Sequence, residues 1–318
     1  MKSCKSLFLA AFLLLVAGTA VSAQDLSCTY KVADRDTCSL YMDVYEPFPG
    51  SETTVDGKDK PTVLFVFGGG FVMGERSSEY HLPWFKLLND NGYRVITVDY
   101  RLGLKGKHLD LRVTKLKESA QTVKDVVDIA VEDVFASVSY ILENAGELGV
   151  DPGNIVIAGS SAGAMTALQA EWYICNGHPL AKVLPSGFNF AGLMSFAGAI
   201  MSNTGKPSFK KAPCPILLIH GTADKIVTYD KMSMGKWGMY GSSALAEFLS
   251  DRQYEYCIYR FKDHNHDMAS NYVATWPEEK RFLEENVAKG SRRVVDAFVD
   301  DPAIPVFAEF GTLEDIYK

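Results

Sequence analysis

Short apolar runs that alternate with helical segments constrain the fold of this chain more than any other feature. Six runs are expected to be strands, at residues 62–67, 93–98, 155–158, 191–196, 216–220 and 256–261. Short runs without regular polar alternation are typical of strands buried on both faces of a mostly parallel sheet. Helices are expected between them, at residues 83–91, 126–143, 162–173, 243–250 and 277–287. The alternation predicts an α/β fold with a mostly parallel, doubly wound sheet and helices on both faces.

The length and composition suit one large globular domain. The chain has 318 residues, of which 47% are hydrophobic, and it contains neither an obvious linker nor an internal repeat. We therefore expect one domain over residues 24–289 and a C-terminal extension over residues 290–318. The same order of elements also builds nucleotide-binding folds, so the motifs must decide the function.

The first residues have the pattern of an export signal. Lys2 and Lys5 precede an apolar run at 7–17, and small residues follow up to residue 23. This order predicts a signal peptide over residues 1–23 and a secreted or periplasmic protein. The alternative, a membrane anchor, needs about 20 apolar residues, which is longer than this run.

The charge balance argues against nucleic-acid partners. The net charge of −7 becomes −9 when the two lysines of the predicted signal peptide are removed. An acidic protein is repelled by phosphate backbones, so no nucleic-acid partner is expected. No basic amphipathic face suggests membrane binding after cleavage, and nothing in the sequence indicates the oligomeric state.

Two cysteines near the start of the mature chain are candidates for a disulfide. Cys28 and Cys38 flank a turn-like segment at 34–37, between expected strands at 29–33 and 40–45. In an oxidising compartment such a pair is the best candidate for a bridge. The other three cysteines of the mature chain are Cys175, Cys214 and Cys257. Because three is an odd number, at least one of them should stay reduced, and their pairing is left open. We expect them to be buried free thiols that pack as small apolar residues.

The pentapeptide at 159–163, Gly-Ser-Ser-Ala-Gly, follows an expected strand and opens an expected helix. A G-x-S-x-G sequence in this context predicts a tight turn that lifts a nucleophilic serine above the sheet. Only Ser161 has glycines two positions away on both sides, so it is preferred over Ser160. The backbone N–H of Ala162, at the start of the helix, is placed to donate to a developing oxyanion.

With these motifs, the chain resembles the bacterial carboxylesterases and the feruloyl or acetyl esterases of the α/β-hydrolase superfamily. The resemblance extends over roughly residues 41–287. It depends on Phe-Gly-Gly-Gly-Phe at 67–71, Asp-Tyr-Arg-Leu at 99–102, the turn at 159–163, and His-Gly-Thr-Ala-Asp at 220–224. It implies that residues 24–289 form an α/β-hydrolase catalytic domain that acts on esters without a cofactor.

The glycines that follow the first buried strand are candidates for the oxyanion hole. The resemblance implies that the N–H groups of Gly69 and Gly70 act together with that of Ala162. Family members usually carry histidine where this chain has Phe67. A phosphate-binding loop is the competing interpretation, but no Lys-Ser/Thr pair follows these glycines.

The acid and the base of a triad are expected further along the chain, in that order. Asp224 follows the strand at 216–220 and is preferred over Asp230 as the acid, whereas His220 is expected to be structural. The base comes from Asp-His-Asn-His-Asp at 263–267. His266 is preferred over His264 because Asn265, which tolerates left-handed backbone angles, precedes it.

Several alternatives remain open at this point. The His-x-His segment with its aspartates suggests a metal site, but no further histidine cluster supports one, so none is predicted. A serine peptidase of the prolyl-oligopeptidase type, or a silent binding protein on a hydrolase scaffold, would carry a similar motif set.

The expected substrate is a small-molecule or carbohydrate-linked ester of undetermined acyl length. The lysine-rich segment at 104–124 is a candidate for recruiting acidic or sugar-linked esters, although a solvated loop and helix is the preferred interpretation. Trp172 and Trp276 are candidates for an acyl pocket, and core packing explains them equally well.

Overall fold

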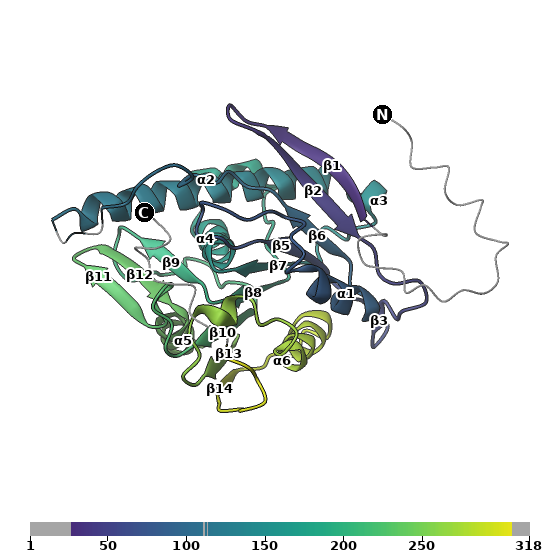
Figure 1. Cartoon of the computed structure of the whole chain (residues 1–318). Coiled ribbons are helices and arrows are strands. Elements are labelled where there is room, and N and C mark those ends of the chain that lie inside the picture. Colours follow the sequence, from purple (N-terminus) through teal and green to yellow (C-terminus); the bar gives the residue numbers. More distant parts are fainter. Residues whose placement is uncertain (1–26, 111, 113, 307–318) are drawn as a thin grey trace.

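A nine-stranded sheet forms the centre of the computed structural model, which describes residues 27–110, 112 and 114–306 (Figure 1). The strand order is β1-β2-β6-β5-β7-β8-β10-β13-β14. The strands are β1 (Ser27–Asp34), β2 (Ser39–Tyr45), β5 (Thr62–Val66), β6 (Val95–Val98), β7 (Ile155–Ser160), β8 (Gly192–Phe196), β10 (Ile216–Gly221), β13 (Tyr256–Phe261) and β14 (Val295–Val299). In this order each strand from β6 to β14 is parallel to its neighbours. Strand β2 is antiparallel to β6, and β1 is antiparallel to β2. The predicted α/β fold and its six buried runs are confirmed.

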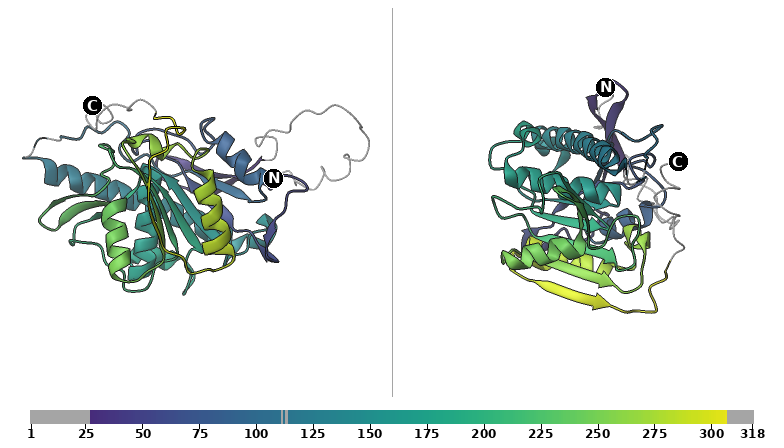
Figure 2. Two further views of the ribbon diagram at one scale, coloured as in Figure 1. Left: turned by 90° about the horizontal axis from the view of Figure 1, so that it is seen from below. Right: turned by 90° about the vertical axis from the view of Figure 1, so that its left-hand side faces the viewer.

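Helices cover both faces of the sheet (Figure 2). They are α1 (Leu82–Asp90), α2 (Leu116–Glu143), α3 (Ala145–Leu148), α4 (Ala162–Asn176), α5 (Ser242–Asp251) and α6 (Trp276–Arg281), which continues as a π-helical turn, η5 (Phe282–Ala288). Short 3₁₀ helices are η3 (Pro179–Val183) and η4 (His266–Ala269). Helices α1 and α6 lie on one face, and α2, α4 and α5 lie on the other. The central strands are therefore buried on both sides, which explains why their sequences do not alternate.

Several short elements were not predicted from the sequence. Strands β9 (Ala199–Ser202), β12 (Trp237–Gly241) and β11 (Lys231–Met234) form a small antiparallel sheet, in which β11 is exposed throughout. Strands β3 (Thr54–Val55) and β4 (Lys58–Asp59) form a short hairpin. Helix α2 begins at Leu116, so the segment at 104–124 is helical from that residue onward. The first turns of α2 are mostly polar, so the apolar spacing that predicts a helix begins only further along the chain.

The expected C-terminal extension is not separate from the domain. Strand β14 pairs in parallel with β13 and forms an edge of the main sheet. The domain therefore continues past residue 289. The predicted signal peptide lies outside the described residues and stays a prediction. Within the described ranges, no helix is both long and apolar enough to cross a membrane.

The predicted disulfide between Cys28 and Cys38 is wrong for this fold. In the β1–β2 hairpin Cys28 pairs with Val44, whereas Cys38 lies at the turn, next to the Asp34–Ser39 pair. Six residues of extended strand separate these positions, a distance of roughly 20 Å. A disulfide requires Cα atoms within about 7 Å of each other. The sequence placed both cysteines in a hairpin but could not give its register.

A buried carboxyl group joins α1 to α6. The indole N–H of Trp84 donates to Glu279 Oε2 at 2.6 Å, and Thr275 Oγ1 lies 2.7 Å from Glu279 Oε1. Burial raises the pKa of Glu279 from 4.5 to about 8. The folded chain therefore binds one more proton than the unfolded chain between these pH values.

We expect this carboxyl group to make the protein less stable as the pH rises. Since the folded state holds the extra proton, the free energy of unfolding falls between pH 4.5 and about pH 8, by roughly 4 kcal/mol at most from this group. Glu279→Gln keeps the shape and does not titrate. Urea unfolding at about pH 5 and about pH 8 should show the variant gaining stability relative to the wild type at the higher pH. An equal difference at both pH values would contradict this account.

Candidate active site

The turn between β7 and α4 holds Ser161 in a strained conformation. Its φ is 49° and its ψ is −116°, outside the ordinary regions for a residue with a side chain. A Cβ atom added to Gly159 would lie 2.3 Å from the carbonyl oxygen of Gly163. One added to Gly163 would lie 2.0 Å from the carbonyl oxygen of Val66. Both glycines are therefore required by close backbone approach, as the motif predicts.

The two serines of this turn have different partners. The Ser160 hydroxyl donates to the carbonyl oxygen of Ala269 at 2.7 Å, in a buried position. Ser161 Oγ instead lies 2.7 Å from His266 Nε2. Only Ser161 therefore has a side chain next to a basic nitrogen.

His266 connects Ser161 to a carboxylate. Its Nδ1 lies 2.7 Å from Asp224 Oδ2, and Asp224 Oδ1 accepts backbone N–H bonds from Ile226 and Val227 at 2.8 and 3.0 Å. Because a carboxylate only accepts, Nδ1 carries the hydrogen and Nε2 is free to accept from the serine hydroxyl. The structure thus brings together the three residues that the sequence selected.

The ionised form of Asp224 is favoured despite its burial. Burial would raise the pKa of this carboxyl, but hydrogen bonds from His220 and His266 outweigh burial and hold the pKa well below its usual range. The side chain is buried, as are those of Ser161 and His266. Asp224 therefore presents a negative charge to His266 in a site with little water.

A close approach of two loops places the histidine over the sheet edge. A Cβ atom added to Gly221, at the end of β10, would lie 2.3 Å from the carbonyl oxygens of both His264 and Asn265. The N–H of Ala223 also donates to His264 O at 2.8 Å. Since β10 and β13 are parallel neighbours, their carboxyl ends meet at this edge.

The backbone around His266 differs from the expectation in one respect. Asn265 has a φ of −98° and is not left-handed, whereas Asp263 has a φ of 60°. Asn265 acts through its side chain, whose Oδ1 accepts the N–H of Asp267 at 2.8 Å at the start of η4. The residue is therefore a cap for the short helix that carries His266.

His264 belongs to a separate pair. Its Nδ1 lies 2.8 Å from Oδ2 of Asp267, a carboxylate with no exposed surface. Each of the two histidines therefore has its own carboxylate. In the part of the chain that the structure describes, no group of three or more His, Cys, Asp or Glu side chains is arranged to hold a metal ion.

The glycine loop after β5 runs along the serine turn. A Cβ atom on Gly68 would lie 3.3 Å from Ser161 Cβ, and Gly69 and Gly70 have φ values of 117° and 62°. Glycine is required at Gly69, where a Cβ atom would lie 2.1 Å from the carbonyl oxygen of Met73. The roles of Gly69, Gly70 and Ala162 as oxyanion donors stay predictions.

Tyr100 supports this loop and was not singled out from the sequence. Its hydroxyl donates to the carbonyl oxygen of Phe67 at 2.9 Å, and its ring stacks on Phe67 with centroids 4.4 Å apart. Phe67 thus packs as an apolar residue where family members usually carry histidine. The sequence pointed to Tyr100 only indirectly, because the segment at 99–102 is one of the motifs on which the family resemblance depends.

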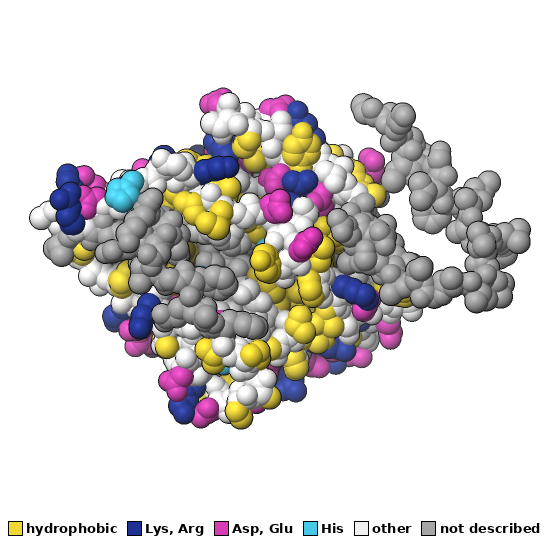
Figure 3. All heavy atoms as spheres, viewed as in Figure 1, with side chains coloured by type: hydrophobic (Ala, Val, Ile, Leu, Met, Phe, Trp, Pro, Cys, Tyr) yellow, Lys and Arg dark blue, Asp and Glu magenta, His cyan; other side chains and the backbone are white. Residues whose placement is uncertain are grey.

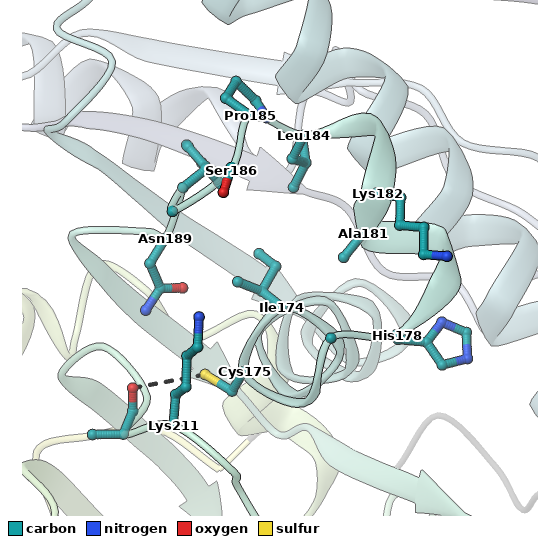
Figure 4. A pocket seen from close by; sticks show the side chains of 14 residues that line it. Ile174, Cys175, His178, Ala181, Lys182, Leu184, Pro185, Ser186, Asn189 and Lys211 are labelled. Atoms are coloured by element: carbon teal, nitrogen blue, oxygen red, sulfur yellow. Dashed lines mark hydrogen bonds between the residues drawn. The ribbon is translucent and has the colours of Figure 1, made fainter.

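A hollow of about 560 Å³ lies at the other end of α4 from Ser161, roughly 22 Å along the helix (Figure 4). Ile174, Cys175 and Lys211 are among the residues that line it. Trp172 is near this end, with its indole N–H bonded to Ser208 O. Trp276 packs against Tyr93. Since Tyr93 precedes β6, it lies at the amino ends of the parallel strands, whereas the site lies at their carboxyl ends. Neither tryptophan lies next to the proposed site.

The face shown in Figure 3 carries hydrophobic side chains over α1 and α6. Two exposed apolar residues lie close in sequence to residues of the site. Met73, in the loop that follows β5, is 62% exposed, and Val273, after η4, is 57% exposed. The basic residues Lys105 and Lys107 are also exposed, and the N–H of Leu104 donates to Phe71 O beside the glycine loop. The surroundings of the site thus offer both apolar and basic groups.

Comparisons with known protein families identify two overlapping matches. A model described as the carboxylesterase family matches residues 19–170, and one described as phospholipase/carboxylesterase matches residues 113–268. Juvenile hormone esterase of Heliothis virescens is 31% identical over 179 residues, which cover 56% of this chain and 28% of that protein. Para-nitrobenzyl esterase of Bacillus subtilis is 30% identical over 206 residues, which cover 64% and 37%. The match thus spans only 28% to 37% of the length of these curated relatives.

Solved structures show a more complete likeness. The apo form of Thermogutta terrifontis esterase 2 aligns with a TM-score of 0.57 and 18% identity, covering 81% of this chain and 94% of that chain. Other structures of that esterase have propionate or butyrate bound, or are phosphorylated by paraoxon. At this level of identity the likeness shows a shared fold.

Proposed function

We propose that the chain, which matches two carboxylesterase family models and has the fold of a known esterase, hydrolyses carboxylic esters through an acyl-enzyme on Ser161. The observation that carries this proposal is the pair of 2.7 Å contacts at His266, from Nε2 to Ser161 Oγ and from Nδ1 to Asp224 Oδ2. A serine next to a neutral, correctly oriented imidazole is an activated nucleophile.

In the first step, Ser161 Oγ attacks the ester carbonyl carbon while His266 Nε2 takes the hydroxyl proton. The negative charge of the tetrahedral intermediate is stabilised by backbone N–H groups of Ala162 and of the glycine loop, at Gly69 and Gly70. His266 then gives its proton to the leaving alcohol oxygen, and the acyl group stays on Ser161.

In the second step, a water molecule attacks the acyl carbon and gives a proton to His266. The tetrahedral intermediate collapses, the carboxylic acid leaves, and the proton returns to Ser161 Oγ. Asp224 remains ionised throughout, because it holds the imidazole in one orientation and stabilises its positive form.

The proposed substrate is a small-molecule ester. The homologous and structurally similar proteins described above are named esterases, and the bound propionate and butyrate of the Thermogutta enzyme are short acids. We also propose that the protein acts outside the cytoplasm; this proposal rests on the sequence of residues 1–23.

The proposal is tested by activity and by labelling of the purified protein. We expect turnover of p-nitrophenyl acetate or butyrate, and a wider panel with methyl ferulate and acetylated xylan would define the acyl and alcohol preference. Paraoxon should abolish this activity and leave one diethylphosphoryl group on the peptide that contains Ser161. The Ser160→Ala variant is the matched control and should be labelled in the same way. Failure to hydrolyse any ester in the panel, or a label on another residue, would contradict the proposal.

A further inference from the structure

The Asp224 carboxylate has a second histidine partner. Oδ2 lies 2.7 Å from His266 Nδ1 and 3.1 Å from His220 Nε2, on the same oxygen atom. His220 is near the end of β10 and has no exposed surface. The hydrolysis described above gives His220 no part, although it touches the carboxylate on which His266 depends.

The contacts of His220 show which of its nitrogens carries a hydrogen. Nε2 also lies 3.1 Å from the carbonyl oxygen of Val227. Since a carbonyl and a carboxylate both only accept, Nε2 carries the hydrogen. Nδ1 lies 2.8 Å from Oγ of Ser242, a fully buried residue that begins α5, beside β10 and β13 (Figure 1). In the neutral ring with its hydrogen on Nε2, Nδ1 accepts from the Ser242 hydroxyl, so both nitrogens have partners.

We propose that His220, itself supported by Ser242, is a positioning residue that directs Asp224 Oδ2 toward His266. The proposal rests on the ester hydrolysis inferred above and adds two residues to the site. The hydrogen bonds then run from Ser161 through His266, Asp224 and His220 to Ser242.

A neutral donor suits this position for an electrostatic reason. In acylation His266 becomes positively charged, and the negative charge of Asp224 stabilises it. A lysine or arginine in contact with Oδ2 would compete for this charge, whereas a neutral imidazole orients the carboxylate without adding a cation. The N–H groups of Ile226 and Val227 hold only the other oxygen, Oδ1.

The charged side chains beside Tyr229, which packs against His220, are paired with one another. The His220 ring packs edge-on against Tyr229 with centroids 5.6 Å apart, and the Tyr229 hydroxyl accepts from Arg260 Nη1 at 2.7 Å. Arg260 in turn forms an ion pair with Asp296 on β14, at 2.6 Å. Arg260 is therefore already paired, and it contacts the Tyr229 hydroxyl, whose ring packs against His220.

Replacement of His220 by leucine, which has a similar volume, tests the proposal. We expect kcat for p-nitrophenyl acetate to fall by about 10- to 100-fold, because a hydrogen bond to a charged group is lost. KM should change little, since His220 is buried and does not reach the substrate. The acidic limb of kcat/KM should move to higher pH, because Asp224 with one donor fewer holds a protonated His266 more strongly. A purely structural role would not move this limb.

Three further variants serve as controls. His220→Gln keeps an N–H donor near the position of Nε2 and should restore most of kcat and the pH profile. Ser242→Ala should change kcat in the same direction as His220→Leu, by about three- to tenfold. Ser243→Ala is matched to it, since the Ser243 hydroxyl accepts from Arg260 and does not contact His220, and it should behave as wild type.

A folded His220→Leu protein with wild-type kcat and an unmoved acidic limb would overturn the proposal. If that variant does not fold, identical kinetics for Ser242→Ala and Ser243→Ala would overturn it instead. Failure of the proposed function has a different signature, because the wild-type protein itself would then hydrolyse no ester and would not react with paraoxon.

Discussion

Replacing Ser161 by alanine is expected to lower kcat for ester hydrolysis by about 10⁶-fold while the fold is retained. Ser161 Oγ is the hydroxyl in contact with His266 Nε2, and Ser160 Oγ is engaged by a backbone carbonyl. Alanine has a Cβ atom, as serine does, so it meets the same backbone strain and removes only the nucleophile. The measurement is kcat on p-nitrophenyl butyrate, with circular dichroism as the check on folding.

Ser160→Ala is the matched control for this experiment. It removes the buried hydrogen bond to Ala269 O and should cost about 1 kcal/mol of stability. Its kcat should stay within a small factor of wild type, because His266 Nε2 contacts Ser161 Oγ and the Ser160 hydroxyl is bonded to Ala269 O. Loss of activity in Ser160→Ala together with retained activity in Ser161→Ala would show that the nucleophile is wrongly assigned.

The parts of the fold that were predicted correctly are those whose signal is local. A strand buried on both faces must be apolar along its whole length, so β5 and β7 are visible in the sequence alone. The serine turn is similarly local, because close backbone contacts require glycine at fixed offsets. The order of acid and base along the chain then follows from the fold family.

The parts that were missed depend on contacts between distant segments. Strand β14 has alternating burial and becomes a strand only because β13 offers a free edge. Cys28 and Cys38 were placed in the correct hairpin, but the register that separates them is set by the pairing with β2. The contact between His220 and Asp224 could not be read from the sequence, because it depends on how the loop after β10 turns back.

The choice between the two histidines had little support from the sequence. Both follow β13 and both lie in the same short loop, so position along the chain does not distinguish them. The contacts of their side chains differ. His266 lies between Ser161 and Asp224, whereas His264 Nδ1 contacts the buried Asp267. The two substitutions therefore remove different interactions.

His266→Ala is expected to lower kcat by about 10⁴-fold or more, because Ser161 then has no base and the leaving group has no acid. His264→Ala should change kcat per folded chain by only a small factor. It should instead reduce stability by about 1–3 kcal/mol, since it leaves the buried Asp267 carboxylate without its histidine partner. Steady-state kinetics on p-nitrophenyl butyrate, combined with urea unfolding of each variant, separate the two effects. A large loss of kcat in His264→Ala and a small one in His266→Ala would reverse the assignment, and the 2.7 Å contact between His266 and Ser161 would then have no catalytic meaning.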